Sequence, residues 1–132
     1  MWELAAVALS AATPADNDRA TFEREEFGAR MTLTCTWFTN FENSRFEQCL
    51  DRTGNIFGTD ERASIKCRPG ICEAMDAEAR KVAHWRKPEP PWGTFTVKLI
   101  GRVGIRSHQP QYLGDGTRTL LIERLLRVRK AR

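Results

Sequence analysis

Four cysteines in a chain of 132 residues constrain its fold more than any other feature. An even number of cysteines in a short exported chain is typical of a disulfide framework. If the chain makes a hairpin turn about Glu42, two of the cysteines lie directly opposite each other on neighbouring strands, within disulfide range. The other two, in the pattern Cys-x4-Cys, would link a strand end to a helix start. The favoured pairing is Cys35–Cys49 with Cys67–Cys72, and the two other connectivities stay open.

The favoured pairing conflicts with the simple alternation of the first hairpin. Cys35 shares a strand face with the apolar Trp37, whereas Cys49 shares its face with the acidic Glu47. Because successive side chains of a strand point to opposite faces, a regular ladder would leave one of the two cysteines on a polar face. We therefore expect either a β-bulge in this hairpin or a different pairing of the cysteines.

The N-terminus predicts export. Leu4–Ala12 is a short apolar run that is followed by the small residues Thr13 and Ala15, the pattern that signal peptidase cuts. The run is too short to span a bilayer, which needs about 20 residues. We interpret residues 1–15 as a signal peptide and the mature protein as periplasmic or secreted. The chain begins with an acidic Met-Trp-Glu where a signal peptide carries Lys or Arg, so a cytosolic domain with reduced thiols stays the alternative.

The remaining chain is long enough for one domain. Residues 16–28 are polar and acidic and are expected to form a flexible arm before a domain at 29–132. Hydrophobic content of 41% and charged content of 29% are ordinary for a globular protein and exclude wholesale disorder.

Period-two alternation predicts a β-rich protein with one helix. Residues 30–38 alternate apolar residues with threonines, and residues 94–106 alternate over a longer stretch in which Gly101 suggests a bend or bulge. Pro69-Gly70 precedes a helical spacing of apolar residues over 71–83. Residues 120–128 fit both the period of two that is typical of a strand and the spacing of a helix. We favour a strand because the strand at 94–106 needs a neighbouring strand to pair with. The predicted strands are 30–38, 45–50, 63–67, 94–106 and 120–128.

Two short motifs resemble those of OB-fold proteins. The turn Asp51-Arg52-Thr53-Gly54 resembles their Asp-x-Thr-Gly turn, and Val97-x-x-x-Gly101-x-Val103 resembles their fourth strand. The order of three strands, a helix and two strands is also theirs, so the chain resembles the small exported OB-fold proteins of bacteria. This resemblance implies a five-stranded OB-like barrel at 29–132 with its helix between strands 3 and 4. Such barrels bind oligonucleotides, oligosaccharides or proteins, so the resemblance leaves the ligand open.

No metal, cofactor or catalytic residue is predicted. Only one pair of cysteines, Cys67 and Cys72, has the short Cys-x4-Cys spacing, whereas a structural zinc site usually uses two closely spaced pairs of cysteines. His84 and His108 could supplement a zinc site, but neither belongs to a recognisable catalytic motif. The candidate catalytic residues of an enzyme are these two histidines, and a hydrolase built from residues distant in the sequence stays open.

The C-terminal end suggests an anionic partner. From Lys98 to Arg132 there are nine basic residues against two acids, although the whole chain has a net charge of only +4. Regular alternation places Arg124 on the face of Leu126 and Val128, so the cations would flank the last strand without forming one pocket. A basic tail that only solubilises the protein is the alternative. The candidate anion-binding residues are Arg124, Arg127, Arg129, Lys130 and Arg132.

Nucleic acid is a less favoured ligand, because an exported protein meets little of it. Arg30, Arg45 and Arg102 could hold phosphates, and four aromatic residues could stack on bases. The aromatic segment is acidic, however, and Trp37 and Phe46 are more simply explained as core residues. The four are Trp37, Phe38, Phe41 and Phe46.

The sequence as a whole predicts an exported, non-enzymatic binding or structural module. Its partner would be an anionic envelope component or a protein. A polyanion- or oligonucleotide-binding protein is the first alternative, and a small enzyme that uses His84 or His108 is the second.

Overall fold

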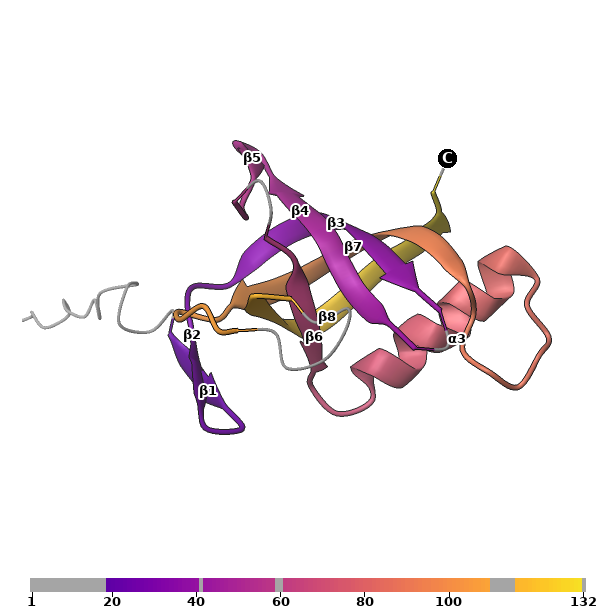
Figure 1. The fold of residues 1–132 in the computed structure, drawn as a ribbon, viewed down its shortest axis with the longest axis horizontal. Coiled ribbons are helices and arrows are strands. Elements are labelled where there is room, and N and C mark those ends of the chain that lie inside the picture. Colours follow the sequence, from indigo (N-terminus) through magenta and orange to yellow (C-terminus); the bar gives the residue numbers. More distant parts are fainter. Residues whose placement is uncertain (1–18, 41, 59–60, 110–115, 132) are drawn as a thin grey trace, which may run out of the picture.

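The protein is mainly β structure with one helix (Figure 1). The computed structural model describes residues 19–40, 42–58, 61–109 and 116–131. The predicted signal peptide, residues 1–15, lies outside the described residues. The strands are β1 (Ala20–Phe22), β2 (Glu25–Phe27), β3 (Met31–Thr39), β4 (Ser44–Asp51), β5 (Gly54–Asn55), β6 (Ala63–Cys67), β7 (Gly93–Val103) and β8 (Arg118–Lys130), and the helix is α3 (Ile71–Ala83).

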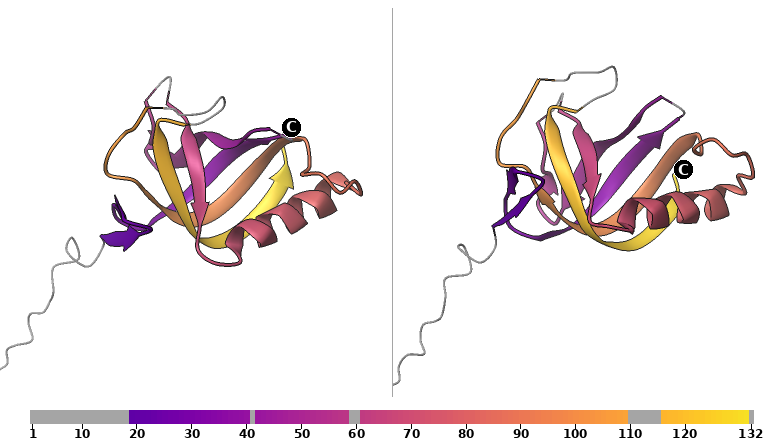
Figure 2. Two further views of the ribbon diagram at one scale, coloured as in Figure 1. Left: turned by 60° about the horizontal axis from the view of Figure 1, so that its bottom comes forward. Right: turned by 90° about the horizontal axis from the view of Figure 1, so that it is seen from below.

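Five of the strands pair in a ring. The order is β3, β7, β8, β6 and β4, and β4 pairs in turn with β3. The β6–β8 pairing is parallel, and the other pairings are antiparallel. Figure 2 shows β8 curving strongly between β7 and β6, with α3 packed alongside it. A ring of strands gives each strand an inward face and an outward face.

The inward faces form the hydrophobic core. On β3, Leu33, Cys35 and Trp37 are buried, while the threonines between them face outward. Trp37 packs against Phe95 of β7 with ring centroids 5.3 Å apart. Alternation of apolar and polar residues therefore decides which side of these strands is core.

Both predicted disulfides are present. Cys35 and Cys49 are opposite each other in the β3–β4 ladder, with Cα atoms 4.0 Å apart, and both are fully buried. The ladder shifts by one residue between Thr36 and Trp37, which leaves Glu47 as an extra residue on β4. This bulge reverses the alternation of β4, so Cys49 and Phe46 both point inward. The bulge resolves the conflict between the cysteine pairing and the strand pattern.

The helix has the predicted bounds. It begins after Gly70, whose φ of 84° favours glycine, and ends at His84, which adopts a left-handed conformation. Met75 and Ala79 bury one side of the helix in the core. The Cys67–Cys72 disulfide joins the end of β6 to the first turn of the helix. No helix among the described residues is long and apolar enough to cross a membrane.

The predicted strand count needs correction. The sequence predicts five strands with the helix between the third and fourth, whereas the described residues form eight strands with the helix between β6 and β7. Two short additions account for the difference, the β1–β2 hairpin and the two-residue β5. Strands of two or three residues are too short to show period-two alternation.

The β1–β2 hairpin lies in the stretch predicted as a flexible arm. Its last residue, Phe27, is fully buried and bridges to Gly104. The Gly28 amide donates to the Val103 carbonyl at 2.9 Å, which fixes the hairpin against the end of β7. Residues 16–18 of the predicted arm lie outside the described residues.

Candidate functional site: a cationic sheet face

The β7–β8 ladder contains two bulges that decide where the C-terminal arginines point. Lys98 pairs with Arg127 but Leu99 pairs with Leu125, so Leu126 is an extra residue on β8. A second shift between Ile100 and Gly101 makes Glu123 an extra residue as well. Each bulge reverses the alternation of β8 relative to β7.

The predicted orientation of Arg124 is therefore wrong. Regular alternation places it on the same face as Val128, but Val128 is buried opposite Val97 while Arg124 is exposed opposite Ile100. Leu126, expected on the same face as Val128, is 41% exposed because it is a bulge residue. The bulge at Leu126 instead places Arg124 on the outward face that carries Arg127 and Arg129.

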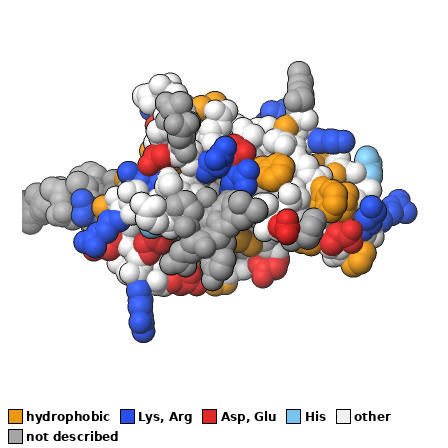
Figure 3. Space-filling view, viewed as in Figure 1, with side chains coloured by type: hydrophobic (Ala, Val, Ile, Leu, Met, Phe, Trp, Pro, Cys, Tyr) orange, Lys and Arg blue, Asp and Glu red, His pale blue; other side chains and the backbone are white. Residues whose placement is uncertain are grey.

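Four cationic side chains therefore lie on one outward face of the β7–β8 sheet. Lys98 of β7 joins Arg124, Arg127 and Arg129 of β8, and among the described residues none of the four makes an ion pair or side-chain hydrogen bond. Charges of both signs are interspersed over the side drawn in Figure 3, whereas this face carries only one sign. We call it the cationic face and define it by Thr32, Thr34, Thr36, Thr96, Lys98, Ile100, Arg124, Arg127 and Arg129.

Of the other two predicted anion-binding residues, the described one does not join this face. Lys130 is exposed, but its ladder partner is the inward-pointing Phe95. Arg132 lies outside the described residues. Lys98, in contrast, is a member that the sequence reasoning missed, because its place beside Arg127 depends on the pairing of two distant strands.

Threonine hydroxyls fill most of the remaining positions. Thr32, Thr34 and Thr36 of β3 lie beside Ile100, Lys98 and Thr96 of β7. Among the described residues, these four threonine side chains have no hydrogen-bond partner. The cationic face therefore offers donors and acceptors as well as positive charge.

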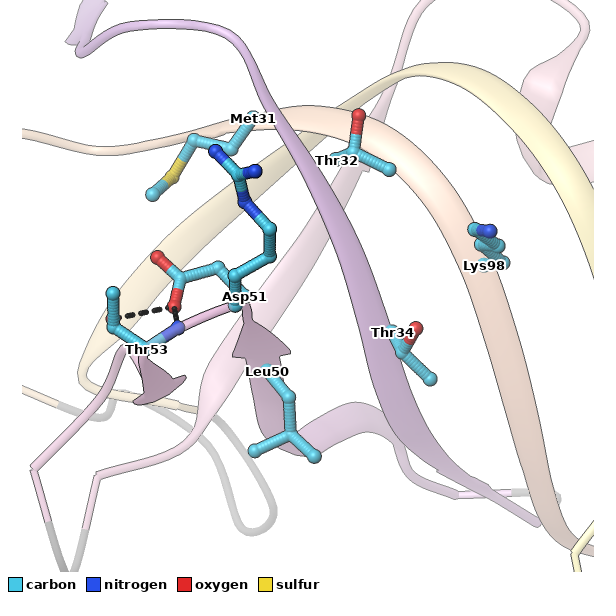
Figure 4. A pocket seen from close by; sticks show the side chains of 8 residues that line it. Met31, Thr32, Thr34, Leu50, Asp51, Thr53 and Lys98 are labelled. Atoms are coloured by element: carbon cyan, nitrogen blue, oxygen red, sulfur yellow. Dashed lines mark hydrogen bonds between the residues drawn. The ribbon is translucent and has the colours of Figure 1, made fainter.

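A groove of about 770 Å³ lies along one side of the cationic face. Figure 4 shows Thr32, Thr34 and Lys98 beside the turn that follows β4. Asp51, the last residue of β4, accepts hydrogen bonds from the amide and the hydroxyl of Thr53 at 2.7 and 2.6 Å, and these bonds lower the pKa of Asp51. The groove is lined by Met31, Thr32, Thr34, Leu50, Asp51, Arg52, Thr53 and Lys98.

Beyond Arg124, at the end of the face, three arginines surround one carboxylate. Glu123 Oε1 accepts from Arg30 Nε at 2.9 Å, and Oε2 lies 2.8 Å from Arg68 Nη2 and 3.1 Å from Arg102 Nε. Burial would raise the pKa of Glu123, but hydrogen bonds from Arg68, Arg30 and Arg102 lower it to about 2. The carboxylate is therefore ionised, and it neutralises one of the three guanidinium charges.

This cluster borders a second cavity that it shares with the cationic face. The cavity has a volume of about 430 Å³ and is lined by Arg30, Arg68, Ile100, Glu123 and Arg124. Among the described residues, Arg30 donates only its Nε and is 62% exposed, so its terminal nitrogens stay accessible. The cavity thus combines an excess of positive charge with free guanidinium donors.

The candidate stacking residues do not lie open on the surface. Trp37 is 4% exposed and Phe46 is fully buried, so both are core residues. Phe38 is covered by the guanidinium of Arg45, which lies 5.0 Å from the ring centroid. Phe41 lies outside the described residues.

The thiols and histidines form no shared centre. All four cysteine sulfurs are in disulfides and none is free, which removes the zinc alternative for them. Within the described part of the chain no cluster of His, Cys, Asp and Glu could hold a metal ion. His84 ends α3, whereas His108 follows β7 and contacts Thr119 Oγ1 at 3.2 Å. Neither histidine lines the two cavities described above.

No protein-family model matches the chain, and neither a curated protein nor a solved structure is significantly similar to it. The function is therefore argued from the geometry of the cationic face and its two cavities.

Proposed function

We propose that this protein is an exported, non-enzymatic binding module that holds an anionic ligand on its cationic face. The observation that carries the proposal is the alignment of Lys98, Arg124, Arg127 and Arg129 on one outward sheet face, where they have no acidic partner among the described residues. Four unpaired cations on one rigid surface repel each other, and an anionic ligand would relieve that repulsion.

The fold we propose for this function is an OB-like barrel. In support, the strands of the ring follow each other along the chain as three strands, one helix and two strands. Export is supported by the apolar run at residues 4–12 and by two disulfides, which fit an oxidising compartment. The envelope or extracellular space would supply the ligand.

Binding is favoured over catalysis by what the cationic face contains. Its chemistry consists of guanidinium, ammonium and hydroxyl groups, and the two histidines lie elsewhere. Guanidinium groups stay protonated at all ordinary pH values and serve poorly as general bases. They are well suited to holding carboxylate, sulfate or phosphate groups.

Retention on immobilised heparin, a soluble polyanion, tests the proposal. We expect the wild-type protein to be retained at low salt and released as salt rises, because counterion release drives such binding. The variant K98Q/R124Q/R127Q/R129Q should elute early while keeping its far-UV circular dichroism spectrum.

A matched control removes positive charge elsewhere. Arg19, Arg86 and Arg106 are exposed and lie outside the cationic face. R19Q/R86Q/R106Q should elute much later than R124Q/R127Q/R129Q, although both variants lose three charges. Equal elution of the two triple variants would refute the cationic face as the binding surface.

A further inference from the structure

We infer that the anionic ligand is a linear acidic polysaccharide lying along β8, with its sugar hydroxyls contacting the threonines of β3 and β7. This inference rests on the proposed function and specifies its ligand.

The cations of β8 lie in single file. Arg127 and Arg129 are two residues apart, which corresponds to about 6–7 Å along a strand. Their ladder partners Lys98 and Thr96 are likewise adjacent outward positions on β7. Arg124 continues the row, because its partner Ile100 is the next outward residue after Lys98. A row of evenly spaced cations fits an extended chain that carries repeated negative charges.

The row ends in the 430 Å³ cavity that contains Arg30, Arg68 and Arg124. Arg68 is held by Glu123, and its guanidinium also lies 4.8 Å from the ring centroid of Phe22. These contacts fix the guanidinium before any ligand arrives, which lowers the entropic cost of binding. The cavity could hold one charged group of the polymer while the rest of the chain follows β8.

The face lacks the feature that a single-stranded nucleic acid needs. Proteins that bind single strands stack bases on exposed aromatic rings. None of the nine residues of the cationic face is aromatic. The rings of Phe38 on β3 and Phe22 on β1 are each covered by an arginine guanidinium.

The face also lacks the apolar surface that a lipid bilayer needs. Peripheral attachment combines cations with a buried apolar face, but Ile100 is the only apolar residue among the nine that define the cationic face. The exposed Leu50 and Leu126 adjoin it on β4 and β8, separated from each other by β3 and β7, so they do not form one apolar patch. Its remaining uncharged positions are threonines with unpaired hydroxyls. Hydroxyls next to cations are suited to a polymer that carries both negative charges and hydroxyl groups.

Calorimetric titration with three probes of similar total charge tests the inference. The probes are a heparin oligosaccharide, a poly(dT) oligonucleotide and vesicles of anionic phospholipid. We expect the heparin oligosaccharide to bind at least tenfold more tightly than either other probe at the same salt concentration. Binding of poly(dT) or of the vesicles with equal or greater affinity would overturn the inference.

The variant T34V/T96V separates the ligand class from simple charge attraction. Valine keeps the β-branched shape and the strand propensity of threonine but removes the hydroxyl. A neutral hydrogen bond contributes about threefold or more in affinity, so the double variant should bind the heparin oligosaccharide about tenfold more weakly. Its affinity for poly(dT) should stay unchanged.

The two hypotheses fail in different ways. Wild-type heparin affinity in T34V/T96V, together with a loss in R124Q/R127Q/R129Q, would overturn the polysaccharide inference and leave anion binding in place. Wild-type heparin affinity in both variants would overturn the proposed function itself.

Discussion

Arg124 lies directly opposite Ile100 in the β7–β8 ladder, on the same side of the sheet as Arg127 opposite Lys98. The two arginines are three residues apart, so an unbroken strand would point them to opposite faces. The bulge at Leu126 brings them together. The cationic face thus depends on an irregularity of β8 as much as on its basic composition.

Replacing Gly101 with alanine should destabilise the fold at the second bulge of this ladder. A Cβ atom at Gly101 would lie 2.7 Å from the Leu121 carbonyl oxygen and 2.9 Å from Leu99 Cδ1. Overpacking of this kind typically costs about 1–3 kcal/mol in the free energy of unfolding, which urea denaturation would measure. G28A is the matched control, because its nearest atom is 3.7 Å away. Equal stability of G101A and G28A would contradict the close packing of β7 on β8.

Removing Cys35–Cys49 should cost more stability than removing Cys67–Cys72. In the chain-entropy model the 15-residue loop contributes about 3 kcal/mol and the six-residue loop about 2 kcal/mol. Cys35 and Cys49 are also fully buried, so their replacement leaves a cavity in the core. Chemical denaturation of C35A/C49A and C67A/C72A would measure the difference. The reverse order would show that the β3–β4 crosslink matters less than the strand-to-helix link.

The Glu123 cluster should make stability depend on pH at the acid end. Because the pKa of Glu123 is lowered from 4.5 to about 2 in the folded protein, its carboxylate stabilises the fold above about pH 4.5. This contribution should be lost as pH falls towards 2. E123Q should remove that part of the pH dependence, and it should cost about 1–3 kcal/mol at neutral pH because Arg102, 7% exposed, loses its charged partner.

Thermal unfolding of wild-type protein and E123Q between these pH values would check this expectation. E42Q serves as the control, since Glu42 is an exposed residue between β3 and β4. If wild type and E123Q lose stability in parallel on acidification, the arginine cluster does not set the acid sensitivity.

Local patterns in the sequence were sufficient to predict the elements with long regular alternation. The helix bounds, the strand at Ala63–Cys67 and the Cys67–Cys72 disulfide agree with the prediction. The Cys35–Cys49 disulfide also agrees, although it depends on a bulge at Glu47 that breaks the local alternation. The outward threonines of β3 were also evident from residues 31–38 alone. These features depend mainly on residues that are close in the sequence, so they can be predicted from local patterns.

The functional face could not be predicted because it depends on bulges and on long-range pairing. The segment Leu120–Val128 fits both a strand pattern and a helix pattern in part, and this ambiguity was the signal of two bulges in one strand. Nothing in the local sequence indicates that Lys98 lies beside Arg127 or that Arg30, Arg68 and Arg102 meet at Glu123. Sheet register across distant strands decides those contacts.

The salt dependence of heparin binding by single variants shows whether Arg124 and Arg127 contact the same bound polymer. Each cation that contacts a linear polyanion contributes about one unit to the slope of log K against log salt concentration. If Arg124 and Arg127 share the cationic face, R124Q and R127Q should each lower the slope by about one unit, and R106Q, outside the face, should leave it unchanged. A slope for R124Q equal to that of R106Q would contradict the proposed binding surface, because it would show that Arg124 does not contact the bound polymer.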